Sequence, residues 1–545
     1  MKTVELERKV EQLEKELESN KQLLVEKENA ISSYVSLIEE LRTKVAMLEI
    51  LHFGTKSEKW TREDERQGRL FNEAEEDAFE QGDNSQEEKQ VETHEVGSYT
   101  RRARNQGRKP LSPDLPREYI TRDIPDDKKV CACGNCLVCI GSEKSERLEI
   151  TPPAVKVIVE EKLKYACKKC EGTDSDSKGV ITAEGKKHLI PRSIASSSLL
   201  AWSLSEKFEF ALPFYRQEKR LAQIGVHIPR ATLSGFAMRA GNVCKPLYDL
   251  LKKHIRSGSL INADETTVQV LKEPDRKPQD KSYMCVYLGG PVGKKAVVFT
   301  YTTSRASKVH KEFLADFKGK LQTDDLGVYH TAVRELNGER QKDRARPPGD
   351  LITHLLCWSH ARRKFHLSWQ ESKSERAAEA LKFIGSIFEL EKLREGRSKI
   401  GFLKLRKNRA EVIFAEFKSW LLDLHPRVPP SLSLGKAVSY TLDNWDQLVT
   451  YVDDSDCVPS NNLAENAIRP FVIGRKNWLF FDEQAGAEAS AILYSLIESA
   501  KLAGLNPYDY LWYLFEKLPY AETEEDLKAL LPFNLTPEQI KPPRS

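Results

Sequence analysis

Hydrophobic residues recur with a helical rhythm at the start of the chain. From Leu6 to about Leu51 their spacings alternate between three and four, without proline or glycine. This heptad pattern predicts a coiled coil over residues 1–52, with Asn20 and Lys27 as polar positions that fix its register. The alternative is a long amphipathic helix that packs on its own protein. We expect the coiled coil, and through it a homo-oligomer.

The next segment, residues 53–120, contains few large apolar residues and separates its charges. Residues 63–95 are dense in acidic side chains, whereas residues 101–110 are basic. This composition predicts an acidic, then basic, disordered linker. Its basic part is either a solvated arm or a DNA contact, for which Arg108 and Lys109 are the candidate residues.

Six of the 10 cysteines gather in two clusters, at residues 131–139 and 167–170. In a reducing compartment such clusters favour metal over disulfides. Two thiolates from each of two turns suit a structural tetrahedral zinc, and no histidine or glutamate accompanies them as in an open catalytic site. We predict a zinc-binding ribbon over residues 121–190. By spacing, the candidate ligands are Cys133, Cys136, Cys167 and Cys170.

Residues 191–256 have the pattern of helices separated by turns. A helix over residues 214–222, a turn at Gly225 and a helix over residues 231–239 match a helix-turn-helix motif, whose second helix enters the major groove of DNA. An ordinary helical hairpin fits the same pattern. The candidate DNA contacts in this region are Arg216, Arg220, Arg230 and Arg239.

From Ser259 onward the pattern changes to that of strands. The order of elements matches the opening of a ribonuclease H-like α/β domain, in which Asp264 on the first strand lies beside Asp324 after the fourth. Residues 257–372 form the first part of this expected core. The expected elements are strands at 260–271, 283–288 and 295–301, a helix at 307–317, and a strand at 319–323.

A long charged stretch separates the two parts of this core. Residues 373–455 are expected to be an all-helical insertion, and residues 456–505 return to the core with Glu465. Glu465 belongs to a short expected helix, which Pro470 and a basic, aromatic segment follow. Residues 506–545 are expected to form a C-terminal helical tail.

Three acidic residues carry the expected chemistry. We predict that Asp264, Asp324 and Glu465 converge to hold two Mg²⁺ or Mn²⁺ ions per site. Two such ions roughly 3.5–4 Å apart stabilise the attacking and the leaving oxygen of a phosphodiester, and hard oxygen ligands hold them. Asp325 directly follows Asp324, and the period-two alternation of a strand directs it to the opposite face.

Composition adds few constraints. The 85 lysines and arginines nearly balance the 82 acidic residues, so the formal net charge of +3 identifies no partner. No apolar run approaches the ~20 residues that span a bilayer, and the N-terminus lacks the apolar core of a signal peptide. We expect a cytoplasmic, multidomain protein without a membrane partner.

Short motifs recur along the chain in a recognisable order. They include Gly107-Arg108-Lys109-Pro110, Lys164-Tyr165-Ala166-Cys167, Ala263-Asp264-Glu265-Thr266, Leu321-Gln322-Thr323-Asp324, and residues 357–365, 461–477 and 495–501. With these motifs the chain resembles, nearly end to end, the transposases of the insertion-sequence-sixty-six family. That family is a branch of the DDE (Asp-Asp-Glu) transposases, those with a helical insertion.

The resemblance implies DNA transposition in a bacterial cell, near the nucleoid when DNA is bound. The partners would be the terminal inverted repeats, the target DNA and accessory proteins of the same element, and the triad would be Asp264, Asp324 and Glu465. It also implies that the first zinc pair is Cys131 with Cys133, so Cys136 becomes an alternative ligand. The remaining implied residues are Arg469, Arg475 and Lys476 near the DNA cut, and Cys357 and His360 as a supporting Cys-x-x-His pair.

Two other functions share parts of this pattern. A non-catalytic DNA-binding regulator, or an inactive relic, would use only the zinc ribbon and the helix-turn-helix. A ribonuclease H-like hydrolase would cleave without joining strands. The intact triad, with its complete C-terminal flank, favours an enzyme over the regulator, whereas the hydrolase shares the same chemistry.

Overall fold

The computed structural model describes Lys27 and residues 95–96, 99–100, 155–166, 180–342 and 350–542 of the 545-residue chain. By its contacts the chain divides into two units, one of Phe79–Ala183 and one of Met1–Ala78 with Glu184–Ser545. The expected coiled coil lies outside the described residues except for Lys27, which is helical. Also outside them are Arg108, Lys109, Cys131, Cys133, Cys136, Cys139, Cys167 and Cys170.

The described part of the smaller unit contains two antiparallel strand pairs. Strand β1 (Glu95–Val96) pairs with β2 (Tyr99–Thr100), and β3 (Lys164–Ala166) pairs with β4 (Val180–Thr182). Strand β3 ends one residue before Cys167.

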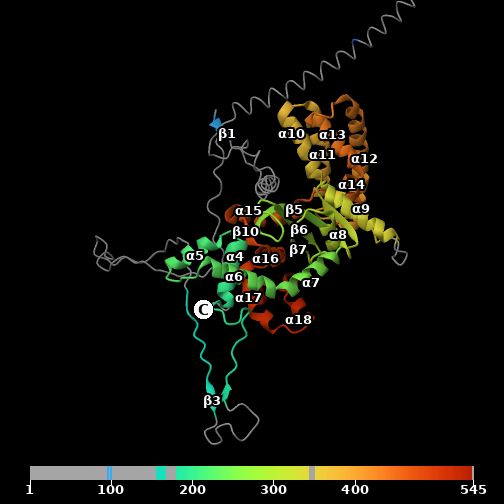
Figure 1. Ribbon diagram of the computed structural model, residues 1–545. Coiled ribbons are helices and arrows are strands. Elements are labelled where there is room, and N and C mark those ends of the chain that lie inside the picture. The colour runs from blue at the N-terminus through green and yellow to red at the C-terminus, as the bar shows by residue number, and fades with distance from the viewer. Residues whose placement is uncertain are drawn as a thin grey trace, which may run out of the picture. The chain divides into compact units, whose positions relative to one another are not determined.

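A mixed sheet lies at the centre of the larger unit (Figure 1). The first three strands form an antiparallel meander, and the next two add in parallel, so that the order is β7-β6-β5-β8-β9. A short sixth strand, β10, pairs in parallel with the far end of β5. The strands are β5 (Leu260–Lys272), β6 (Lys281–Gly289), β7 (Ala296–Thr302), β8 (Gly319–Thr323), β9 (Ile352–Leu356) and β10 (Phe481–Glu483).

Strands β5 to β8 lie at the four strand segments expected from the sequence, and they bury apolar side chains in the sheet; β9 and β10 were not among the expected strands. Strand β5 is central, and both of its faces are covered by other parts of the protein. Its polar residues are therefore buried together with its apolar ones. Asn262, Glu265 and Thr266 are all buried within it. Buried polar groups need partners, so these positions mark where the sheet makes specific contacts.

Helices cover the sheet and share its main hydrophobic core. Ser499 of α16 accepts from the backbone N–H of Val297 in β7 and donates to its carbonyl, and Ser495 accepts from the N–H of Phe299. These bonds fix the helix on the sheet. The helices of this part are α4 (Ser197–Phe208), α5 (Phe214–Gln223), α6 (Arg230–Val243), α7 (Lys245–Arg256), α8 (Ser307–Leu314), α9 (Gly327–Lys342), α15 (Asn462–Trp478), α16 (Gln484–Leu502), α17 (Pro507–Lys517), η4 (Leu518–Tyr520), α18 (Glu524–Ala529), η5 (Pro532–Asn534) and α19 (Pro537–Ile540).

The two helices of the expected helix-turn-helix are α5 and α6. Helix α6 buries Leu233 and Phe236 in the main core. A Cβ atom on its Gly241 would lie 2.8 Å from the Cβ of Ala489 in α16, so only glycine allows this close approach. The motif therefore packs into the core of the larger unit.

A second hydrophobic core belongs to the helices between β9 and α15, which stand together as a bundle in Figure 1. It includes Trp358 and Phe365 of α10, so that α10 packs with the insertion expected from residue 373 onward. The buried Arg406 donates to the backbone carbonyls of Tyr451, Val452, Asp454 and Cys457. The elements are α10 (Trp358–Ser372), α11 (Glu375–Lys392), α12 (Lys399–Leu424), η2 (His425–Arg427), α13 (Ser433–Asp443), α14 (Trp445–Val449) and η3 (Thr450–Asp453).

The insertion leaves and re-enters the sheet at adjacent points. The backbone N–H of Trp358 donates to the carbonyl of Pro459 at 2.8 Å. The N–H of Asn461 donates to the Sγ of Cys357 at 3.1 Å. These two bonds close the insertion at its base.

Helix α15 differs from the expectation at Pro470. The sequence predicted a short helix that proline follows, but the helix continues through Pro470 to Trp478. Proline removes one helical hydrogen bond, yet Phe471 and Val472 beyond it are buried in the main core. Tertiary packing on both sides of the proline therefore maintains the helix. No helix in the described ranges is long and apolar enough to cross a membrane.

Candidate active site

Asp264 and Asp324 lie level with each other on neighbouring parallel strands. The register of β5 and β8 pairs Leu260 with Lys320 and Asn262 with Gln322. The same offset places Asp264 opposite Asp324, the first residue after β8. Strand order and register thus bring together two carboxylates that are far apart in the sequence.

A buried chain of side-chain amides fixes the start of α15 against these strands. Asn262 Nδ2 donates to Gln322 Oε1 at 2.9 Å and to Asn461 Oδ1 at 3.0 Å. Asn461 Nδ2 donates in turn to the carbonyl of Ala263 at 2.9 Å. Glu465 lies about one helical turn beyond Asn461, so this amide lock sets its position relative to Asp264.

The charges of the three acidic residues act on one another. Burial, then the charges of Glu465 and Asp324, raise the pKa of Asp264 well above its ordinary value. Burial also raises the pKa of Asp324, although the charges of His360 and Arg305 oppose this effect. Crowded, buried carboxylates of this kind are stabilised by a cation, and their hard oxygen atoms suit a divalent one.

Cys357 and His360 lie beside Glu465. One ligand atom from each of the three residues lies within 4.8 Å of the others. Burial, then the charge of Glu465, raises the pKa of the Cys357 thiol to about 12, so the thiol stays protonated at neutral pH. His360 lies near Glu465, and its charge also acts on Asp324. It thus stands between the two carboxylates, at the base of the insertion.

The ligand atoms of Asp264, Asp324 and Glu465 lie farther apart than those of Cys357, His360 and Glu465. Among the described residues, the two groups whose ligand atoms all lie within 4.8 Å are Cys357–His360–Glu465 and Glu265–Cys285–His310. The three acidic residues are therefore more widely spaced than the ligands of a single small ion. A pair of ions roughly 3.5–4 Å apart requires such a wider spacing.

Asp325 is held away from its neighbour Asp324. Its Oδ1 lies 2.8 Å from Nε2 of His330, and its Oδ2 accepts from Asn444 Nδ2 at 3.1 Å. Although burial acts in the opposite direction, these hydrogen bonds lower the pKa of Asp325. Asp325 thus connects α9 with the end of α13 in the insertion.

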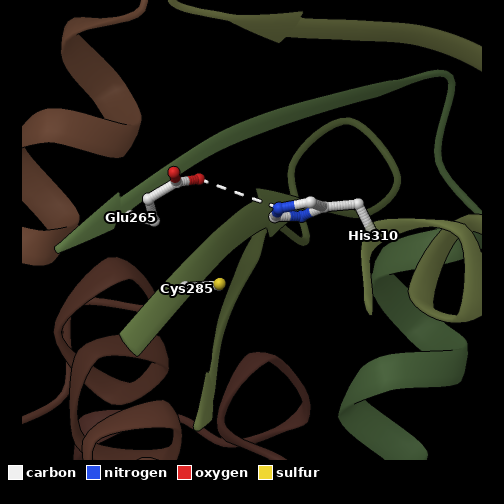
Figure 2. Close-up of side chains that lie close together, drawn as sticks. All are labelled: Glu265, Cys285 and His310. Atoms are coloured by element: carbon white, nitrogen blue, oxygen red, sulfur yellow. Dashed lines mark ion pairs between the residues drawn. The ribbon is translucent and has the colours of Figure 1, made fainter. Parts of the chain in front are cut away.

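Two residues that the sequence did not single out also lie at this site. Glu265 is buried, and its Oε1 lies 2.5 Å from Nε of Arg305. Figure 2 shows Glu265 and His310 pointing toward each other, with Cys285 beside them. The Asp-Glu pair within an apolar strand was a visible signal for Glu265. The partner Arg305 lies 40 positions away, and no spacing rule connects the two.

The basic residues proposed for DNA contact differ in their surroundings. Arg475 is half-buried and donates to Thr266 Oγ1 of β5 at 3.0 Å, so it also ties α15 to the sheet. Lys476 is exposed, and Arg469 is partly buried. The four candidate arginines in the helix-turn-helix region are exposed, namely Arg216, Arg220, Arg230 and Arg239.

Comparisons with known proteins match nearly the whole chain. The family model described as "Transposase IS66 family" matches residues 192–489, and the "IS66 C-terminal element" matches residues 495–533. The "zinc-finger binding domain of transposase IS66" matches residues 128–171. The "Transposase C of IS166 homeodomain" matches residues 40–120.

Curated relatives come from Sinorhizobium fredii. The uncharacterized protein y4jD is 30% identical over 438 residues, which cover 78% of this chain and 82% of the relative. The uncharacterized protein y4qI is 28% identical over 472 residues, covering 85% of this chain and 84% of the relative. The similarity to both thus extends well beyond the sheet and its insertion.

Proposed function

Because the chain belongs to the transposase IS66 family, we propose that it binds the ends of its insertion element, cleaves the DNA there and joins it to a target. The family makes it a transposase with a zinc-finger domain. The observation that supports the proposed chemistry is that the charges of Glu465 and Asp324 act on the buried Asp264, whose strand pairs with the strand that Asp324 follows.

The catalytic fold that we propose is ribonuclease H-like. Its support is the strand order, in which an antiparallel meander is followed by two parallel strands on the far side of the first. This order puts the first strand at the centre, next to the fourth, so that one acidic residue from each can serve one site. The third comes from α15, after the helical insertion.

The carboxylates of Asp264, Asp324 and Glu465 would hold two Mg²⁺ or Mn²⁺ ions. Bound there, the ions would supply charge stabilisation for the attacking and the leaving oxygens of the phosphodiester. The protein contributes the positions of its ligands, since the amide lock orients Glu465 and the sheet register aligns the two aspartates. His360 would orient Glu465 as its neighbour.

Contacts to DNA would extend from α6 to the end of α15. Exposed Arg230 and Arg239 suit α6 as the helix that enters a major groove, and Lys476 lies exposed on the last turn of α15. Arg108 and Lys109 would add phosphate contacts. The coiled coil would join copies of the chain, and proteins of the same element would assist.

Strand transfer on DNA that carries the element's own ends tests this proposal. With Mg²⁺ or Mn²⁺, the parent protein should join these ends to a target, and Glu465→Gln should abolish joining while it still binds the ends. Asp325→Asn is the matched control, because His330 and Asn444 already occupy that carboxylate. It should retain most activity. Joining by Glu465→Gln would refute the assignment, and binding without joining by every variant would favour a regulator.

A further inference from the structure

Glu265 is a buried carboxylate that does not belong to the proposed metal triad. It follows Asp264 in β5, and the alternation of the strand directs it to the other face of the sheet. Its side chain is 3% exposed, whereas that of its partner Arg305 is 45% exposed. A buried carboxylate is costly unless it is paired, so Arg305 is a required partner for Glu265.

Arg305 lies at the same end of the sheet as the triad. It stands between β7 and α8, and its charge lowers the pKa of Asp324 against the effect of burial. Its guanidinium carbon lies 5.6 Å from the ring centre of Tyr283. Arg305 is thus hydrogen-bonded to the buried Glu265 and lies near Asp324 of the proposed triad.

Within the described ranges, the hydrogen bond of Arg305 uses Nε and leaves both terminal amino groups available. A guanidinium presents these groups as a planar fork that matches two oxygens of a phosphate. Their partial exposure keeps them accessible to a ligand from solvent.

The other oxygen of Glu265 faces His310. Its Oε2 lies 3.8 Å from Nε2 of that ring (Figure 2), and among the described residues this oxygen accepts no hydrogen bond. Nδ1 of His310 lies 2.8 Å from the hydroxyl of Tyr287. The ring of His310 also lies 4.3 Å from that of Tyr329. His310 thus packs beside the carboxylate of Glu265, and the hydrogen bond between Arg305 Nε and Glu265 Oε1 sets the direction of the guanidinium.

Glu265, Cys285 and His310 also have the chemistry of metal ligands, and their ligand atoms lie within 4.8 Å of one another. One observation argues against a resident ion: Arg305 already supplies the positive charge on Glu265. The cluster is better explained as an anchor for the arginine.

We propose that Arg305 binds a phosphate of the DNA strand being cut, and that Glu265 is the residue that positions it. This inference rests on the proposed function, because it adds a substrate contact to the same site. The guanidinium of Arg305 would stabilise the charge on the non-bridging oxygens of that phosphate, in addition to the charge stabilisation that ions held by the three carboxylates would supply.

The first test measures binding of a duplex with the element's end at several salt concentrations. Removing one phosphate contact should reduce the slope of log Kd against log salt by about 1 for Arg305→Ala. Arg305→Lys should keep the slope because it keeps the charge. Lys308→Ala is the matched control, since Lys308 is 83% exposed on the adjacent helix and faces Glu312. It should leave the slope unchanged.

The second test measures the rate of strand cleavage. Arg305→Ala should reduce the rate by about 10²-fold, as for the loss of one preorganised donor, and Arg305→Lys should recover only part of it. If Glu265 acts through Arg305, Glu265→Gln should slow the parent but not slow Arg305→Ala further. If Arg305→Ala does not fold, the double variant Glu265→Gln/Arg305→Ala replaces it, because it removes the buried Glu265 charge that would otherwise lack a partner.

Several outcomes would overturn the inference. An Arg305→Ala variant with the parental salt slope and the parental cleavage rate contradicts the phosphate contact. Loss of a bound metal ion on Cys285→Ala contradicts the anchor, because an ion would then hold Glu265. A parent that binds DNA but never cleaves it counts against the proposed function, whereas the salt slope still decides whether Arg305 contacts phosphate.

Discussion

The ammonium group of Lys207 is surrounded by three aromatic rings. Its Nζ lies 4.5 Å from the ring centre of Phe214, 5.4 Å from that of Trp478 and 5.7 Å from that of Phe208. Burial lowers the pKa of Lys207 to about 8. Cation–π attraction offsets part of the cost of burying the charge. The residue thus joins α4, α5 and the end of α15 at an energetic cost.

Replacing Lys207 with methionine should stabilise the protein at pH 7 by about 1–3 kcal/mol, because a buried charge is removed and the volume is kept. The folded state has the lower pKa, so it binds fewer protons than the unfolded state between about pH 8 and the ordinary lysine value. The stability of the parent therefore rises with pH across that window. The stability that Lys207→Met gains over the parent should therefore decrease as the pH rises through this window.

Urea unfolding at pH 7 and at about pH 10 measures this difference. Lys219→Met, an exposed change on α5, is the control and should have little effect at either pH. A Lys207→Met variant less stable than the parent at pH 7 would mean that the rings stabilise the cation by more than its burial costs.

At the scale of the element, the position of α15 depends on its first residues. Asn461 precedes the helix and makes side-chain hydrogen bonds to both Asn262 and Ala263. All these groups are buried, so loss of one partner leaves another without its hydrogen bond. The helix would keep its own backbone bonds but lose its fixed relation to β5.

Asn461→Ala should therefore lower the free energy of unfolding by about 2–3 kcal/mol and reduce strand joining, while binding of the element's ends stays near the parental level. Asn466→Ala is the matched control, because Asn466 is exposed on the same helix. Urea unfolding and the joining assay measure the two effects. Parental joining by a folded Asn461→Ala protein would show that the amide lock does not set the position of Glu465.

The elements were more predictable than their contacts. Short hydrophobic runs located β5 to β8, because burial in a sheet requires apolar side chains over the length of a strand. Helix α15 was expected to be shorter, since local rules weigh Pro470 but not the packing of Phe471 beyond it. The packing of α6 against α16 was hidden for the same reason: it depends on Gly241 meeting Ala489, which are far apart in the sequence.

The candidate site was predictable only in part. Strand order, the helical position of Glu465 and the family resemblance together selected Asp264, Asp324 and Glu465 among many acidic residues. The pairing of Glu265 with Arg305 could not be predicted, because the two residues meet only once the sheet and α8 are in place. Partners of this kind depend on tertiary structure, and no local pattern encodes them.

At the scale of the whole molecule, the zinc-finger domain gives a further prediction. The full-length protein, purified under reducing conditions, should contain about one zinc per chain, as one four-thiolate site requires. Changing Cys167 or Cys170 to serine should remove it, and serine at Cys131, Cys133 or Cys136 should identify the first ligand pair. Metal analysis by mass spectrometry measures the ratio. A parent protein without zinc would contradict the four-thiolate ribbon.

The closed base of the insertion has a consequence for the history of the protein. Residues 358–458 begin and end at two points that one backbone hydrogen bond joins, from Trp358 to Pro459. The entropy of closing such a loop grows only slowly with its length, so helices far from this base can be lengthened or shortened at little entropic cost. Changes on the outer surface of the bundle would then leave His360 and the acidic residues at its base in place.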